Sequence, residues 1–285
     1  MVRQVAKAAG ALSLALLITR PLLSQRLVHY SSFSDRPDLY RAVIEQVPPR
    51  ALPELKGRGI PYGIVTHHLL ASHLIVQYFR GVAQAGNPKR IVVIGPDHSR
   101  KGLEGISLSS LAWQTPFGLL EADRAAITRL EQRLHRQQDP EAFSNEHSLG
   151  ILVPFIKYFF PNARVVPILV RMGVGKRNLD ALYQALAELR GAETHFILSS
   201  DFSHGKSPGE AAKQDLDSAR VIAGQAFDDV WGLDVDCRTG LYVLLRLSPG
   251  AKPWISAHTN SAEIAGKNID NCTSYFTVFF LSNNP

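Results

Sequence analysis

The chain contains too few cysteines for a fold that depends on disulfide bonds. Cys237 and Cys272 are the 2 cysteines in 285 residues, whereas a disulfide framework needs several pairs in a short chain. A single disulfide, a metal-binding role and simple packing all stay open for these thiols. Hydrophobic residues make up 45% of the chain and charged residues only 20%. We therefore expect an ordered domain with one large core rather than a disordered chain.

Long runs of one charge are also missing. The net charge is +6, but the basic residues are scattered and are not interleaved with aromatic residues as in proteins that bind single-stranded nucleic acid. We therefore predict no nucleic-acid partner. The surplus of positive charge indicates a solvated surface that favours anionic lipid or an anionic substrate.

The apolar run near the N-terminus is too short to predict a membrane-spanning helix. It extends from Ala8 to Thr19, after Arg3 and Lys7, and ends at Arg20-Pro21, whereas a span needs about 20 apolar residues. The run is typical of a signal-peptide core or a short anchor, although an amphipathic leader helix lying on the domain is an alternative. We predict a leader over residues 1–31 and one domain over residues 32–285. The location is then cytoplasmic, or at a membrane through residues 8–24.

Three segments share one pattern, in which an apolar strand runs directly into polar side chains. The first is Ile91 to Ile94, which Gly95-Pro96 ends, because proline cannot extend a strand ladder and glycine permits a sharp turn. The polar groups after the three strands are Asp97-His98, His67-His68 and Asp201-Phe202-Ser203-His204. Because open α/β sheets place their ligands at the carboxyl ends of strands, we predict one shared site at one edge of a sheet.

Strand and helix patterns alternate along most of the chain. We predict helices over residues 34–47, 69–85, 121–136, 149–160 (bent by Pro154), 176–190, 209–227 and 237–247, with strands over 62–66, 91–94, 106–109, 164–170, 194–200, 254–258 and 273–281, and a turn that re-enters the sheet at 113–118. This βαβ-like order predicts an α/β fold, a single three-layer domain with a central mostly parallel or mixed sheet.

The candidate residues for chemistry are those that the predicted loops bring together: His67 or His68, His98, His147, Asp201, His204 and Cys237. Imidazole and thiolate donors suit a transition metal better than magnesium or calcium. Alternatives stay open: Asp201 as a turn cap, His204 as an exposed loop residue, Cys237 as an inert buried thiol. We expect structural roles for the remaining histidines, His29, His73, His135, His195 and His258.

Five motifs together resemble the Memo family, which is called AmmeMemoRadiSam system protein B in prokaryotes. They are Thr66 to Ala71, Gly95 to His98, Glu146 to Ser148, Ser199 to His204 and Asp236-Cys237. The resemblance covers residues 62–282 and implies a fold similar to that of class III extradiol ring-cleaving dioxygenases, which use non-heme iron. It also implies the metal ligands His67, His98 and Cys237, with His147, Asp201 and His204 as catalytic residues around the same pocket.

Three positions depart from the family pattern. Thr66 stands where the family often has proline, Leu69-Leu70 replaces a glycine-tyrosine pair, and Gly150 replaces an acidic residue. These changes alter the pocket wall and remove one carboxylate. They leave the choice between His67 and His68 open.

Three function classes follow. The first is a non-heme metal oxidoreductase, in which a thiolate ligand favours iron or copper, His204 or His147 moves a proton, and Asp201 orients a ring. The second is a zinc-dependent hydrolase. The third is a non-catalytic scaffold that works with a radical SAM enzyme and an AMMECR1-like protein, as the family's prokaryotic name implies.

Overall fold

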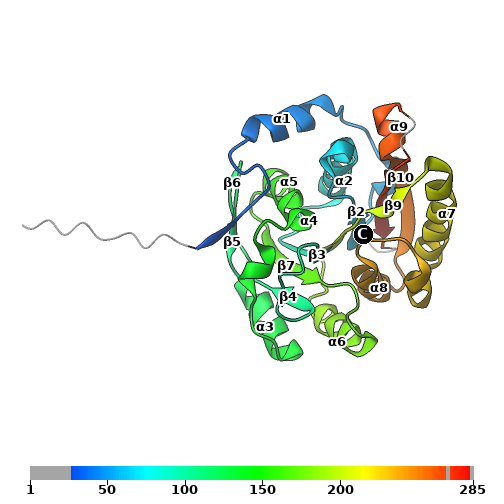
Figure 1. Cartoon of the computed structure of the whole chain (residues 1–285). Helices are drawn as coiled ribbons and strands as arrows, with labels where there is room; N and C mark the ends of the chain where they lie inside the picture. The colour runs from blue at the N-terminus through cyan, green and yellow to red at the C-terminus, as the bar shows by residue number, and fades with distance from the viewer. Residues whose placement is uncertain (1–26, 268–269, 283–285) are drawn as a thin grey trace, which may run out of the picture.

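The computed structural model describes residues 27–267 and 270–282, and a mixed β-sheet lies at its centre (Figure 1). Within these residues, eight strands form the sheet in the order β10-β11-β2-β8-β3-β7-β4, with β9 paired to β11. They are β2 (Tyr62–Val65), β3 (Arg90–Pro96), β4 (Ile106–Leu108), β7 (Arg164–Val170), β8 (Thr194–Ser199), β9 (Phe202–Lys206), β10 (Lys252–Asn260) and β11 (Cys272–Leu281).

The four central strands, β2, β8, β3 and β7, are parallel, and the outer pairings β10–β11, β11–β2 and β7–β4 are antiparallel. The helices are α1 (Pro37–Gln46), α2 (Ser72–Ala85), α3 (Arg124–Leu134), α4 (His147–Gly150), α5 (Leu152–Phe159), α6 (Lys176–Ala187), α7 (Pro208–Gly224), α8 (Arg238–Leu247) and α9 (Ser261–Ala265). Short 3₁₀ segments are η1 (Pro53–Leu55), η2 (Leu69–Ala71), η3 (Pro140–Phe143) and η4 (Phe227–Gly232).

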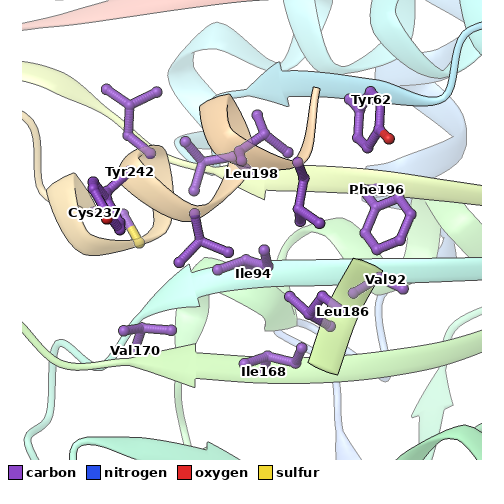
Figure 2. Packing of buried hydrophobic residues seen from close by; sticks show 14 of the residues in the cluster. Tyr62, Val92, Ile94, Ile168, Val170, Leu186, Phe196, Leu198, Cys237 and Tyr242 are labelled. Carbon is purple, nitrogen blue, oxygen red and sulfur yellow. The ribbon is translucent and has the colours of Figure 1, made fainter. Parts of the chain in front are cut away.

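Helices cover both faces of the sheet, because each central strand is apolar on both sides. In β3, Val92 and Ile94 pack into a core with α3, α6 and α8, while Ile91 and Val93 pack into a second core with α2 and α5. Successive residues of a strand point to opposite faces, so a continuous apolar run fills two cores. Figure 2 shows part of the first core. The predicted three-layer α/β fold with a mixed sheet is confirmed.

The prediction that residues 113–118 re-enter the central sheet is wrong. They belong instead to β5 (Ala112–Thr115) and β6 (Gly118–Leu120), which form a separate three-stranded sheet with β1 (Val28–Tyr30). The turn is tight because Thr115 Oγ1 accepts from the Phe117 amide at 3.2 Å and donates to the Gly118 carbonyl at 2.6 Å. Gly118 takes a φ of +102°, which favours glycine, and β6 therefore folds back on β5.

The long apolar helix is interrupted, but not at Pro154. It divides at Ile151 into α4 and α5. Pro154 has no N–H to donate to the Gly150 carbonyl, and that carbonyl accepts from the Ser32 amide at 2.9 Å instead. The proline thus frees a carbonyl that ties the N-terminal segment to the domain.

The predicted leader lies almost wholly outside the described residues, which begin at Leu27. Val28–Tyr30 pairs in parallel with β5, and His29 packs at 4.8 Å from Trp113 and contacts Ser109 Oγ at 2.7 Å. Among the described helices, none combines the length and apolar character needed to span a membrane.

A glycine in β2 makes the packing of the second core testable. A Cβ at Gly63 would lie 2.6 Å from Tyr78 Cε2, and Tyr78 is held in place because its hydroxyl contacts His195 Nε2 at 2.7 Å. We expect Gly63→Ala to lower the free energy of unfolding by about 1–3 kcal/mol or more through overpacking. Gly191→Ala is the control, since no atom beyond its chain neighbours lies within 4 Å of the point where its methyl group would stand. Chemical denaturation of both variants measures the difference, and equal stabilities would contradict this account of the core.

Candidate metal centre

The carboxyl ends of β2, β3 and β8 meet at one edge of the sheet, as predicted. β8 pairs in parallel with both neighbours, with Val65 beside Ser199 and Ile94 beside Leu198. The chain leaves these strands at His67, His98 and Asp201. His147 at the start of α4 and Asp236 in the loop before α8 complete the cluster.

Three imidazoles converge at this edge. Ring nitrogens of His67, His98 and His147 lie within 4.8 Å of one another. The rings of His98 and His147 stack with centroids 4.2 Å apart, and each lies 5.2 Å from the His67 ring. His67 is only 2% exposed, so the cluster extends from the protein interior to the surface.

Two carboxylates adjoin the same rings. Asp236 Oδ2 lies 3.3 Å from His67 Nε2 and 3.5 Å from His98 Nε2, and Asp201 Oδ2 lies 3.8 Å from His67 Nε2. The other oxygen of Asp236 accepts from Ser200 Oγ at 2.7 Å and from the Asp201 amide at 3.1 Å. Oδ2 itself is buried and accepts no hydrogen bond of good geometry from the described residues. A buried carboxylate oxygen in that state has room to accept a cation beside the two rings.

In two of the rings, a hydrogen bond at Nδ1 leaves Nε2 as the nitrogen that faces the cluster. Ser199 Oγ donates to the Ser148 carbonyl at 2.6 Å, so it accepts from His67 Nδ1 at 3.0 Å. His98 Nδ1 donates to Glu146 Oε1 at 2.8 Å. A neutral imidazole that donates through Nδ1 has its lone pair on Nε2. Both Nε2 atoms therefore face Asp236 as potential ligand atoms, with the second-nitrogen partner that metal-binding histidines usually have.

Charges within the cluster shift its titration. Burial lowers the pKa of His98, but the carboxylates of Asp236 and Glu146 outweigh burial and raise it to about 10. His67 shifts the same way, because Asp201 and Asp236 outweigh its burial and raise its pKa. Burial and the neighbouring rings lower the pKa of His147 to about 4. In the absence of a metal, the carboxylates are thus matched by imidazolium rings.

Glu146 holds His98 in place, a role that the sequence did not predict for this motif residue. Its side chain is fully buried and accepts from the His98 amide and the Ser148 amide, each at 2.9 Å. Burial raises the pKa of Glu146, but the hydrogen bonds from His98 and Ser148 outweigh it and lower the pKa to about 2. Asp97 lies apart from the ring, with Oδ2 3.3 Å from Arg171 Nη2 and 3.2 Å from the Gly102 amide.

The cluster contains four of the predicted site residues, and the remaining two lie elsewhere. His67, His98, His147 and Asp201 take part in the groups of potential metal donors, whereas Cys237 and His204 take part in none among the described residues. His204 is exposed on β9 and lines a cavity of about 560 Å³ that also reaches His98 and Asp236. His68 faces away from the cluster and stacks on Tyr275 with ring centroids 5.7 Å apart.

Cys237 lies in the first hydrophobic core, next to the cluster in sequence. Figure 2 shows it beside Tyr242 on α8, above Ile94. Its side chain is fully buried, and burial together with nearby Asp236 raises the pKa of the thiol well above its usual range. The role of Cys237 as a ligand stays a prediction, and Asp236 is a further potential donor, which the sequence reasoning passed over.

Comparison with known proteins agrees with the motifs. Residues 31–225 match the family model described as Memo-like protein. The chain is 30% identical over 258 residues to a MEMO1 family protein of Pyrobaculum arsenaticum, covering 84% of this chain and 90% of that protein. It is 32% identical over 171 residues to the MEMO1 family protein PAE0818 of Pyrobaculum aerophilum, covering 57% of this chain and 60% of that protein.

A solved structure shares the fold alone. The crystal structure of uncharacterized protein JW3007 from Escherichia coli K12 superposes with a TM-score of 0.52 at 12% identity, covering 78% of this chain and 99% of that one. The family match and the relatives bear out the resemblance that the five sequence motifs indicate. The chain belongs to the Memo family.

Proposed function

We propose that this protein binds a transition metal at the carboxyl edge of its sheet and acts there as a non-heme iron oxidoreductase. One observation carries the proposal: Asp236 Oδ2 lies 3.3 Å and 3.5 Å from the Nε2 atoms of His67 and His98. A metal with bonds of about 2.1 Å separates neighbouring ligand atoms by roughly 3.0–3.4 Å. The spacing of Asp236 Oδ2 from each ring nitrogen is therefore close to the spacing of neighbouring ligand atoms around one metal.

The donor chemistry supports iron ahead of other metals. His67, His98 and Asp236 would hold the ion as two imidazoles and one carboxylate, a set with open positions that is typical of non-heme iron(II). When bound, such an ion supplies Lewis acidity and one-electron chemistry. The thiolate of Cys237 was the main reason to rank copper beside iron, and a carboxylate in its place weakens that reason.

The surrounding residues have separable tasks in this proposal. Asp201 accepts from the His67 amide at 3.4 Å and lies beside its ring, so it orients His67. The His147 side chain is 51% exposed and stacks on His98, which suits it to exchange protons with a molecule bound beside that ring. His204 lines the cavity that reaches His98 and is the second candidate for that exchange.

The metal content of the protein, purified without oxygen, tests the proposal. We expect about one iron per chain, lost in His98→Ala and retained in His135→Asn, which alters an exposed histidine on another part of the surface. Added dioxygen should then be consumed by the iron-loaded protein in the presence of a reductant or substrate. Bound zinc would instead favour the hydrolase. A protein that takes up no metal, but co-purifies with a radical SAM enzyme or an AMMECR1-like protein, would favour the scaffold.

A further inference from the structure

We propose that the cavity beside the metal centre binds a small organic anion through the guanidinium groups of Arg238 and Arg100. The identification of that anion as the substrate rests on the proposed metal function, whereas its binding does not. The cavity measures about 560 Å³ and is lined by His98 and Asp236 as well as by both arginines. That volume is within the range of about 300–1,000 Å³ for pockets that hold small molecules.

The carboxylates that line the cavity already have cationic partners. Asp97 lies 3.3 Å from Arg171, and Asp234 lies 3.7 Å from Lys206. Asp236 faces the histidines described above. None of these acids is therefore available to neutralise a further cation in the wall.

Arg238 and Arg100 are the arginines of the cavity wall whose charge is not balanced by any of these carboxylates. Within residues 27–267 and 270–282, neither forms an ion pair. Arg238 donates only to the Trp231 carbonyl at 3.0 Å and toward Met172 Sδ at 3.6 Å. These contacts hold the guanidinium in position without cancelling its charge. Arg100 is exposed, and no side-chain hydrogen bond to a described residue restrains it.

The positions of these arginines relate the anion to the metal centre. Arg238 begins α8 two positions after Asp236, so one end of a ligand can reach the guanidinium while the other reaches the histidines. A guanidinium matches the two oxygens of a carboxylate or phosphate with paired N–H donors. The recognised chemistry is thus an oxyanion on a small molecule whose reacting end lies near His98.

Calorimetric titration of the metal-free full chain with succinate, and separately with inorganic phosphate, tests the inference. Succinamide is the neutral control for succinate. We expect one or both anions to bind, succinamide not to bind, and Arg238→Gln to weaken anion binding tenfold or more, with a further loss when Arg100→Gln is added. Arg58→Gln, which removes an exposed charge outside the cavity lining, should bind like the wild type. The preferred anion identifies the substrate group as carboxylate or phosphate.

Two further measurements separate this inference from the proposed function. Thermal melting should be unchanged in Arg238→Gln, which shows that the variant is folded. Metal titration of the same variants should give wild-type affinity, because neither arginine contacts the donor cluster. If anion binding depends on the arginines but the protein takes up no metal, the result contradicts the proposed function and supports this inference. Three results would overturn this inference alone in a protein that takes up metal. They are no anion binding, binding of succinamide as tight as that of succinate, and anion binding by Arg238→Gln as tight as that of the wild type.

Discussion

Asp236→Ala is expected to remove stoichiometric metal binding, and Cys237→Ala is expected to keep it. Asp236 Oδ2 is within 3.5 Å of both Nε2 atoms that face the centre, whereas the thiol of Cys237 is buried in the hydrophobic core. Loss of a partner that only orients a ligand costs roughly 10–100-fold in metal affinity. Loss of the ligand itself should exceed that range, and titration of both variants with ferrous ion measures the difference.

Stability measurements distinguish a variant that has lost its metal site from one that has lost its fold. Cys237→Ala removes a buried sulfur from the core, so we expect a lower free energy of unfolding, by about 1 kcal/mol, with metal affinity maintained. Asp236→Asn keeps the shape of the side chain and its contact with Ser200, and should lose metal while staying folded, with a melt below that of the metal-free wild type because the imidazolium rings lose a carboxylate partner. If Cys237→Ala lost the metal and Asp236→Ala retained it, the thiolate implied by the family resemblance would be the ligand after all.

The sequence predicted the parts of the fold that depend on local patterns. The run Ile91–Ile94 is apolar at every position, so a strand buried on both faces followed directly, and β3 packs into both cores. β9 escaped prediction because Phe-Ser-His-Gly-Lys has no strand pattern, and its pairing depends on β11 far along the chain. The β1–β5–β6 sheet was missed for the same reason, since β1 pairs with residues 112–114.

The sequence located the segments that form the site, but it did not always identify which side chain of a segment faces the cluster. Strand ends located His67, His98 and Asp201, because the end of an apolar run is a local signal. The segment of Asp236 and Cys237 was also found, but neighbouring residues point in different directions, and the motif does not tell which one faces the rings. In the structure the thiol packs in the core and the carboxylate lies beside the histidines.

The partner of His98 could not be identified from the sequence, for the same geometric reason. Asp97 precedes His98 in the chain, which makes it the natural choice for a residue that orients the ring. In the structure, its carboxylate turns to Arg171 and the Gly102 amide. Glu146 comes from a different segment and meets His98 only once α4 packs near the end of β3.

These assignments predict a ranked series of metal affinities at His98. His98→Ala should abolish binding, because it removes a donor nitrogen. Glu146→Gln should weaken binding by roughly 10–100-fold, as expected for a partner that orients a ligand, because the ring loses the carboxylate 2.8 Å from its Nδ1. Asp97→Asn should leave metal affinity unchanged and affect only its contacts with Arg171 and Gly102. Titration with ferrous ion ranks the three variants against the wild type.

Folding and binding must be read separately in this series, since Glu146 also accepts from two backbone amides. We expect Glu146→Gln to melt below the wild type, because an amide nitrogen cannot replace a carboxylate oxygen that accepts from an N–H. His98→Ala should melt below the metal-free wild type, since the buried Glu146 carboxylate loses its imidazolium partner. Comparing melts with and without ferrous ion then isolates the metal: stabilisation should be full in Asp97→Asn, reduced in Glu146→Gln and absent in His98→Ala. Equal stabilisation in all three would remove His98 from the centre, whereas a deficit confined to Asp97→Asn would show that Asp97, and not Glu146, orients the ring.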